Sequence, residues 1–183
     1  MNFRPAFDEL YRLAFITRYS NMPRIRNESV AEHSFFVASI TIQMRQILHF
    51  DLAKVVTLAI IHDWPEARVD DVSHKVKRDF PEVKKALRQA EGKIIEDYAP
   101  ELQLQYRNID SELQTFNHLI LHLADAVQCV QYSQAEINLG NKYMDTIYKE
   151  SVERSCELIA KIPAEKYMLG YSSIDLMKAL RLA

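Results

Sequence analysis

The chain has 183 residues, of which 48% are hydrophobic and 26% charged, a composition typical of a globular domain. A chain of this kind buries enough apolar surface to fold, so extensive disorder is excluded. The formal net charge of −2 lacks the strong basic excess of proteins that coat nucleic acids, so no nucleic-acid polymer is expected as a partner. Three glycines in the whole chain argue against an all-β fold with many tight turns. We therefore predict an all-α fold.

The sequence contains no targeting signal and no obvious domain boundary. No apolar run approaches the length of about 18 residues that suggests a membrane span, and the segment MNFRPAFDEL lacks the apolar core of a signal peptide. Cys129 and Cys156 lie within apolar helical patterns, which favours buried thiols over a disulfide. We expect a cytoplasmic protein with no membrane partner. Because repeats and long linkers are absent from the sequence, residues 1–183 are predicted to form one domain.

The first third of the chain contains two helical signals. Residues 5–19 carry apolar side chains at roughly a helical period, whereas the following segment RYSNMPRIRN is polar and predicted to be irregular. Ser29 and Glu32 form a capping-box pattern in front of an apolar run. This pattern predicts a helix over about residues 30–48.

The next segment is predicted to be helix, loop and helix. Residues 52–62 are apolar on nearly all sides, which predicts a short helix buried in the centre of the molecule and ending before Pro65. Residues 68–80 are charged and aperiodic, so we predict that they are mostly loop. Pro81 suits the first turn of a helix over 82–98, where an apolar stripe has helical spacing.

The last part of the chain predicts two longer helices and a shorter one. Ser111 and Gln114 give a cap signal for a long apolar helix that Gly140 would end. A further helix is expected over about 142–161. The final residues, 164–183, are expected to form a short helix or an arm.

Adjacent His62 and Asp63 close the predicted buried helix. Neighbours on a helix point about 100° apart, so both can reach one ion only at a helix end. An ionisable pair at the end of an apolar segment needs a partner, which a divalent metal would supply, with a structural His–Asp hydrogen bond as the alternative. His33, in the first turn of its helix, and Asp125, within an apolar helix, would complete two nitrogen and two oxygen ligands. Such a set suits a transition metal such as zinc, manganese, cobalt or iron better than calcium.

Four motifs carry a family resemblance: AEHS, then IIHDWPEA about thirty residues later, then VDDVSHKVK and LADAVQ. Together they resemble the HD-domain metal phosphohydrolases, in particular the small HD 5′-deoxyribonucleotidases and the phage HD dATP triphosphohydrolases. The resemblance covers about residues 10–160 and implies a single compact HD-domain helical bundle that assembles into a homo-oligomer. It implies one divalent metal held by His33, His62, Asp63 and Asp125.

The same resemblance assigns the remaining site residues. Glu66 and Asp71 would be catalytic, because either can orient the attacking water or transfer a proton. Arg18 and Lys77 would bind the substrate by neutralising charge on its phosphoryl oxygens. Tyr19 would also contact the substrate, but it stands where the bacterial nucleotidases carry a tryptophan implicated in selecting deoxyribose. Selectivity for the sugar is therefore left open.

The resemblance implies a 2′-deoxynucleotide as the substrate and leaves two reactions open. One converts a 5′-deoxynucleoside monophosphate to deoxynucleoside and phosphate. The other converts a dNTP, with dATP as the candidate, to deoxynucleoside and triphosphate, with Mg²⁺ as a further ion. The second is supported by more positive charge than one monophosphate requires, carried by Lys75, Lys77, Arg78, Arg24 and Arg26. The rival from another class is a non-catalytic HD module that binds metal and nucleotide for regulation.

Three further candidates, a histidine pair and two single residues, have two interpretations each. His118 and His122 stand four residues apart on the helix of Asp125, a spacing that can bind zinc, although an ordinary helical role is the simpler interpretation. His74 could contact phosphate or face solvent. Trp64 could stack on a base or pack in the core.

Overall fold

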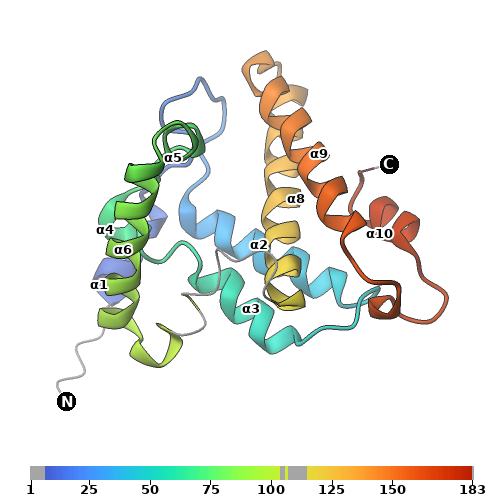
Figure 1. The fold of residues 1–183 in the computed structure, drawn as a ribbon. Helices are drawn as coiled ribbons and strands as arrows, with labels where there is room; N and C mark the ends of the chain where they lie inside the picture. The colour runs from blue at the N-terminus through green and yellow to red at the C-terminus, as the bar shows by residue number, and fades with distance from the viewer. Residues whose placement is uncertain (1–6, 104–105, 107–114, 183) are drawn as a thin grey trace.

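The computed structural model describes residues 7–103, 106 and 115–182. In this part of the chain the regular elements are all helices, accompanied by two isolated bridges between extended residues (Figure 1). The predicted all-α class is confirmed. None of the helices in the same residues combines the length and the apolar character needed to cross a membrane.

The first helices end at Ala14, short of residue 19, to which the helical period extends, and residues 18–27 are irregular, as predicted. The helices then resume. Their bounds are α1 (Phe7–Leu10), the 3₁₀ helix η1 (Tyr11–Ala14), α2 (Val30–Met44), α3 (Leu52–Ile61), α4 (Glu66–Val69), α5 (His74–Asp79), α6 (Pro81–Tyr98), η2 (Pro100–Leu102), α8 (Phe116–Asn138), η3 (Lys142–Met144), α9 (Asp145–Ala160), η4 (Ala164–Lys166) and α10 (Ser173–Ala179).

Local capping chemistry sets the ends of the helices that matter most for the site. The predicted capping box of α2 is present: the Ser29 side chain accepts from the backbone N–H of Glu32, whose carboxylate accepts from the Ser29 N–H. Thr115 caps the start of α8, while Ser111 and Gln114, which carried the predicted cap, lie outside the described residues. Gly140 follows α8 with φ of 100°, a conformation that favours glycine.

Two sequence predictions need correction. The segment 68–80 is not mostly loop, because it contains the end of α4 and all of α5. The helix α5 begins where the Ser73 side chain accepts from the backbone N–H of Val76, and it buries no residue, so no apolar period announced it. The helix α3 is not buried on all sides, since Ile60 is 44% exposed.

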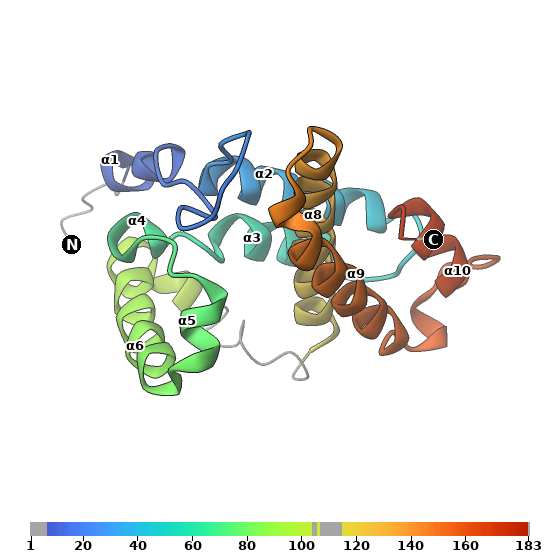
Figure 2. The same cartoon turned by 90° about the horizontal axis from the view of Figure 1, so that it is seen from above.

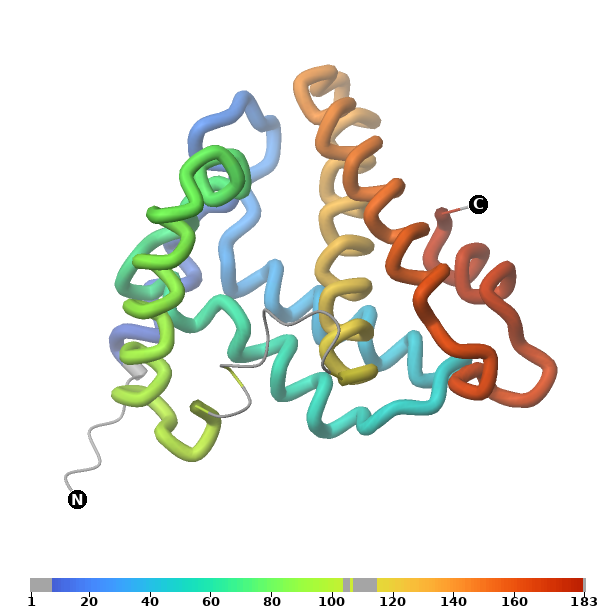
Figure 3. The backbone as a smooth tube through the Cα atoms, viewed as in Figure 1, coloured from blue at the N-terminus to red at the C-terminus, as the bar shows by residue number. Residues whose placement is uncertain are grey.

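The core lies where α2, α3 and α8 pack together, as Figure 3 shows for the path of the chain. Val37 of α2, Leu58 of α3 and Leu123 of α8 are among its fully buried side chains. Along the outer side, α9 packs against α8 and α10 against α9. Figure 2 shows α4, α5 and α6 grouped on the other side of α3. This arrangement brings the start of α2, the end of α3 and the middle of α8 toward one region.

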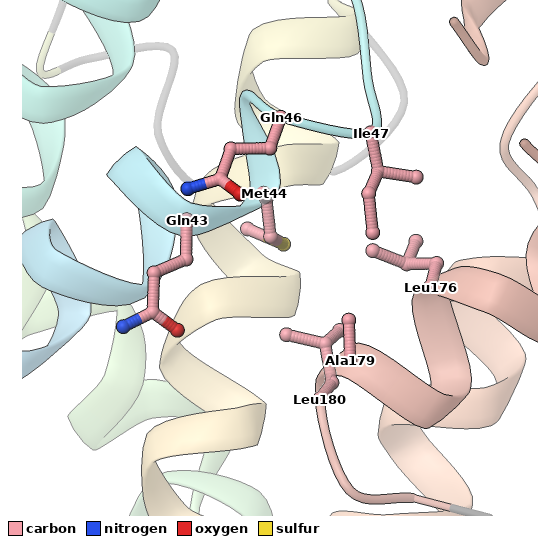
Figure 4. A pocket seen from close by; sticks show the side chains of 7 residues that line it. All are labelled: Gln43, Met44, Gln46, Ile47, Leu176, Ala179 and Leu180. Carbon is pink, nitrogen blue, oxygen red and sulfur yellow. The ribbon is translucent and has the colours of Figure 1, made fainter.

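A cavity of about 280 Å³ lies away from that region, between the end of α2 and α10 (Figure 4). Its walls contain no ionisable side chain and come from Gln43, Met44, Gln46, Ile47, Leu176, Ala179 and Leu180. No side chain of this lining is suited to acid–base catalysis, so this cavity is not a candidate active site.

Candidate active site

His33 lies at the centre of a cluster of ionisable side chains. The cap at Ser29 starts α2 one turn earlier, and the backbone N–H of His33 donates to the Ser29 carbonyl. The imidazole is buried, and its Nε2 atom lies 3.3 Å from His62 Nε2 and 3.3 Å from Asp125 Oδ1. Asp63 Oδ2 lies 3.5 Å from the same atom.

His62 is oriented by the backbone of its own helix. It follows the last residue of α3, and its Nδ1–H donates to the carbonyl of Ala59 over 2.8 Å. In the neutral ring this leaves a lone pair on Nε2, directed at the cluster. Burial lowers the pKa of His62, an effect that His33 reinforces and that Asp63 and Asp125 oppose. The neutral form, which can bind a metal, is therefore favoured.

The two aspartates bring negative charge to the same point. Asp63 Oδ2 lies 3.2 Å from His62 Nε2, and Asp125 contributes from the middle of α8 with its side chain 39% exposed. Desolvation acts to raise the pKa of Asp125, but its hydrogen bond with His33 and the charges of His33, His62 and Arg18 leave it lowered. Asp125 is therefore ionised at neutral pH.

This cluster fits a divalent metal. One ligand atom from each of His33, His62 and Asp63 lies within 4.8 Å of the others, and Asp125 reaches His33 Nε2. Two imidazole nitrogens and two carboxylates are a donor set used by catalytic transition metals, and it leaves positions open for water and substrate. The structure thus brings together all four ligands predicted from the sequence.

A cavity of about 170 Å³ opens directly onto the cluster. The end of α3 and the start of α4 form one wall, α5 and α6 a second, and α8 a third. Its lining comprises His62, Asp63, Pro65, Glu66, Lys77, Glu91, Tyr106, Leu121, His122 and Asp125. The predicted residues Glu66 and Lys77 therefore share one space with the proposed metal ligands.

Glu66 lies at the start of α4, held there by the turn that Pro65 begins. The side chain is buried, and desolvation raises its pKa well above the ordinary value of 4.5. Asp63 and Asp71 raise this pKa further, whereas Lys77 and Arg18 oppose the shift. The carboxyl therefore favours its protonated form. Asp71 influences Glu66 electrostatically but is absent from the lining residues of the cavity.

Arg18 approaches the cluster from behind His33. Its Nη1 lies 2.6 Å from His33 Nδ1, 2.8 Å from Gln128 Oε1 and 3.2 Å from Glu28 Oε2. Neighbouring Tyr19 takes a left-handed backbone conformation, with φ of 55°, and stacks on Tyr132 with ring centroids 5.3 Å apart. A left-handed tyrosine is strained, and such strain is common at functional sites.

Arg18 and Tyr19 are not among the residues that line the cavity, and the remaining basic and aromatic candidates also lie outside it. Arg24 holds its own loop together by donating to the carbonyls of Tyr19 and Met22 and to Asn27, and Arg78 pairs with Asp79. Of α5, only Lys77 lines the cavity. Exposed side chains include Arg26, His74 and Lys75. Trp64 packs against both apolar clusters, as expected for a core residue.

The pair His118 and His122 does not form a second metal site with a third ligand among the described residues. His118 is buried, and its Nδ1 pairs with Thr115. His122 lies on the cavity wall, a position that our simpler interpretation did not anticipate.

Sequence reasoning also missed Glu28 and Gln128, the two buried groups around Arg18 and His33. A signal was present, because His122, Asp125 and Gln128 recur every three residues in the apolar middle of the helix. Neighbours at this spacing lie on adjoining parts of the helix surface. Three polar side chains in such a row indicate a common polar environment.

Comparison with known proteins agrees with this geometry. The model of the family described as "5′-deoxynucleotidase YfbR-like" matches residues 6–170. The chain belongs to this family. A 5′-deoxynucleotidase of Photorhabdus laumondii is 31% identical over 147 residues, covering 74% of this chain and 75% of the relative. One of Pectobacterium atrosepticum is 29% identical over 170 residues, covering 86% and 85%.

Solved structures show the same fold. A conserved hypothetical protein of Pyrococcus furiosus aligns with a TM-score of 0.73 at 21% identity, covering 97% of this chain and 98% of that one. An HD-domain phosphohydrolase of Listeria innocua gives 0.65 at 23% identity, covering 96% and 93%. The HD phosphohydrolase DatZ of cyanophage S-2L, bound to dA and one catalytic Zn²⁺, gives 0.63 at 14% identity, covering 99% and 94%. The HD-domain bundle predicted from the sequence is confirmed.

Proposed function

We propose that this protein is a metal-dependent phosphohydrolase that converts 5′-deoxynucleoside monophosphates to deoxynucleosides and phosphate. The observation that carries the proposal is the convergence of His33, His62, Asp63 and Asp125 on one cavity that also contains Glu66 and Lys77. The 5′-deoxynucleotidase relatives support the reaction and the substrate class. A module that only binds nucleotide would have no need of a buried glutamate on the cavity wall beside its metal.

The distribution of positive charge favours the monophosphate. Of the five basic residues that suggested a triphosphate, Lys77 alone is among the residues that line the cavity. Four acidic side chains line the same space, those of Asp63, Glu66, Glu91 and Asp125, and Glu66 is the one that favours its neutral form. A triphosphate would bring several more negative charges into this surrounding, and few cations there could compensate them.

The four proposed ligands would hold the metal, with His62 fixed by Ala59 and His33 by its buried neighbours. A bound divalent metal supplies Lewis-acid chemistry, lowering the pKa of water and withdrawing charge from phosphoryl oxygens. We take zinc as the first metal to test, because the cyanophage neighbour is described with a catalytic Zn²⁺.

Side chains of the protein would bind the phosphate and transfer the proton. Lys77, on the cavity wall, and Arg18, beside His33, would bind the phosphoryl oxygens and stabilise their charge as it shifts toward the leaving group. Water would attack phosphorus as the P–O5′ bond breaks. Glu66, whose pKa is raised, would donate its proton to the departing 5′-oxygen, and the proton lost by the water would restore the carboxyl. The confined space would orient the phosphate. Asp71 would act on the reaction through the charge it places near Glu66.

One assay tests the proposal. Purified protein is supplied with Zn²⁺, Co²⁺, Mn²⁺ or Mg²⁺ and with dNMPs, dNTPs and the matching ribonucleotides, and the products are separated by chromatography. We expect deoxynucleoside and orthophosphate from dNMPs, and no turnover by Asp63→Ala. Asp79→Ala, which changes an aspartate of α5 outside the cavity lining, serves as the control and should stay active. Release of intact triphosphate from a dNTP would replace the proposal with the triphosphohydrolase reaction.

Turnover of no nucleotide by metal-loaded protein would overturn the proposed reaction and favour the regulatory module. The ribonucleotide arm of the same panel measures the sugar selectivity that the residue Tyr19 left open. The cytoplasmic location, the single domain over 1–183 and the homo-oligomeric state stay predictions from the sequence. Size-exclusion chromatography with light scattering tests the last of these.

A further inference from the structure

We propose that Gln128 is a positioning residue that holds the metal ligand His33 and the arginine Arg18 in a fixed relation, with Glu28 fixing Gln128 in turn. Neither Gln128 nor Glu28 emerged from the sequence patterns. The arm of the proposal that concerns Arg18 rests on the proposed function, whereas the arm that concerns His33 depends on metal binding alone.

The orientation of the Gln128 amide is determined by its neighbours. Its Nε2 donates to Glu28 Oε1 at 2.5 Å, and only the nitrogen of an amide can donate to a carboxylate. The oxygen must therefore face the other way, where His33 Nδ1 and Arg18 Nη1 each lie 2.8 Å from it. Gln128 and Glu28 are each 2% exposed, so water does not compete for these bonds.

A metal on His33 would make this oxygen necessary. When Nε2 binds a metal, the neutral ring carries its proton on Nδ1, and that proton needs an acceptor. Arg18 Nη1 also lies 2.6 Å from Nδ1, but a guanidinium has only donors. Among the neighbours of Nδ1 in the described residues, Gln128 Oε1 is the group that can accept. Once a metal is bound, this oxygen would therefore stabilise the tautomer that leaves Nε2 available to the metal, in place of the one in which Nδ1 accepts from Arg18 over 2.6 Å.

The same oxygen also fixes Arg18. Arg18 Nη1 donates to it and to Glu28 Oε2, 3.2 Å away, so Arg18, Gln128 and Glu28 form a closed ring of hydrogen bonds. A guanidinium is planar and rigid, so holding one nitrogen restricts the direction of the other donors. One amide thus sets the distance between the metal ligand and the group proposed to bind phosphate.

The first test replaces Gln128 by methionine, which has a similar shape but neither donates nor accepts well. Gln131→Met is the matched control, because Gln131 is exposed on the same helix. Affinity for Zn²⁺ is measured by chelator competition without substrate, and the melting temperature of both variants is measured as well. We expect Gln128→Met to lose about 10–100-fold in Zn²⁺ affinity and Gln131→Met to lose less than threefold. Equal affinity in Gln128→Met and the wild type would overturn the proposal.

An exchange of the two groups separates positioning from folding. Gln128→Glu alone places two carboxylates against each other, and we expect it to lose Zn²⁺ affinity and thermal stability. Adding Glu28→Gln restores one amide and one carboxylate with their positions reversed, so that the acceptor facing His33 and Arg18 is again held by an amide N–H. We expect the double variant to recover Zn²⁺ affinity to within about fivefold of the wild type. Recovery of the melting temperature without recovery of affinity would show a structural role only and overturn the proposal.

The arm that concerns Arg18 is tested with dNMP turnover. Gln128→Met should lower kcat/KM at least tenfold in the wild type at saturating metal, but less than threefold when Arg18→Ala is already present. Equal losses in both backgrounds would overturn the link to Arg18. A wild-type protein without turnover would end the proposed function, and the Zn²⁺ measurements would still decide the role of Gln128 toward His33.

Discussion

The site depends on how single residues are surrounded. Glu66 is an ordinary glutamate in the sequence, yet burial and the nearby Asp63 and Asp71 raise its pKa. His62 is an ordinary histidine, yet the carbonyl of Ala59 decides which of its nitrogens is free. In both cases the surroundings determine whether, or on which atom, the side chain carries a proton. That in turn determines which chemical step the side chain can perform.

Replacing Glu66 by glutamine should lower kcat for dNMP hydrolysis by about 10²–10⁴-fold, because an amide cannot give up a proton to the 5′-oxygen. Affinity for Zn²⁺ should stay within threefold of the wild type, since the four proposed ligands are unchanged. Steady-state kinetics and chelator competition measure the two quantities. Glu82→Gln on the exposed start of α6 is the control. Unchanged kcat in Glu66→Gln would remove Glu66 from proton transfer.

At this scale the sequence predicted residues with distinctive chemistry better than residues with an ordinary one. A His–Asp pair at the end of an apolar helix is unusual enough to suggest a ligand set. Gln128 was not predicted, because a glutamine on a long helix is usually solvent-exposed. Its role became visible only when Glu28, a hundred residues away in sequence, was placed against it.

At the scale of elements, the loop between η1 and α2 is important because it carries Arg18 and Tyr19. Glu136 of α8 fastens this loop, because its carboxylate accepts from the backbone N–H groups of Ile25 and Arg26, both at 2.7 Å, and from Asn141. Burial acts to raise the pKa of Glu136, but these hydrogen bonds leave it below 4.5. Arg18 and Tyr19 therefore lie on a loop tied to the helix of Asp125.

Acid should loosen this attachment. A carboxyl whose pKa is lower in the folded state than in the unfolded state stabilises the fold above its ordinary pKa, and the contribution disappears as pH falls through the lower value. For Glu136 the loss begins near pH 4.5 and continues below it. Denaturant unfolding between about pH 5 and 3 should therefore show a steeper loss of stability in the wild type than in Glu136→Gln. A parallel decline in both would contradict the assignment, and Glu150→Gln, exposed on α9, is the control.

The capping box of α2 can be tested against a second capping box, which begins α10. Ser29 with Glu32 begins α2, and Ser172 with Asp175 begins α10. Either serine replaced by alanine should lower the free energy of unfolding by about 1 kcal/mol. Only Ser29→Ala should also weaken Zn²⁺ binding, because His33 lies in the following turn. Calorimetry and chelator competition measure these effects, and equal Zn²⁺ affinity in the two variants would show that the cap does not position His33.

Elements with an apolar period or a clear cap were predictable. The capping box identified α2, and proline marked the start of α6. The helix α5 was not predicted, because it buries no side chain and its short run of charges has the composition of a loop. Because α5 carries Lys77, the wall of the cavity that this helix forms could not be predicted from the sequence.

Across the whole molecule, the proposed ligands join segments far apart in the sequence. His33 comes from α2, His62 and Asp63 from the end of α3, and Asp125 from α8. The all-α class was predictable because it depends on local patterns, and the same kind of pattern predicted that these four residues would lie together. The position of α5 and α6 opposite α8 across the cavity was not predictable. It depends on packing between helices whose sequences contain no sign that they lie near one another.

Metal binding should therefore stabilise the entire fold. At a free Zn²⁺ concentration 100 times Kd, linkage predicts about 2.7 kcal/mol of additional stability. For a chain of this size that corresponds to a rise in Tm of about 5–11 °C. Scanning calorimetry with and without a chelator measures the shift. Asp63→Ala should show little of it, and an equal shift in that variant would place the metal at another site.

The order of the ligands along the chain also affects how the protein is made. A ribosome releases His33, His62 and Asp63 well before Asp125, and α2 and α3 both pack against the helix that carries this last ligand. A nascent chain that ends before α8 has three of the four donors and lacks the surface that sets their spacing. If the proposed ligands hold a metal, we therefore expect metal loading to follow the docking of α8.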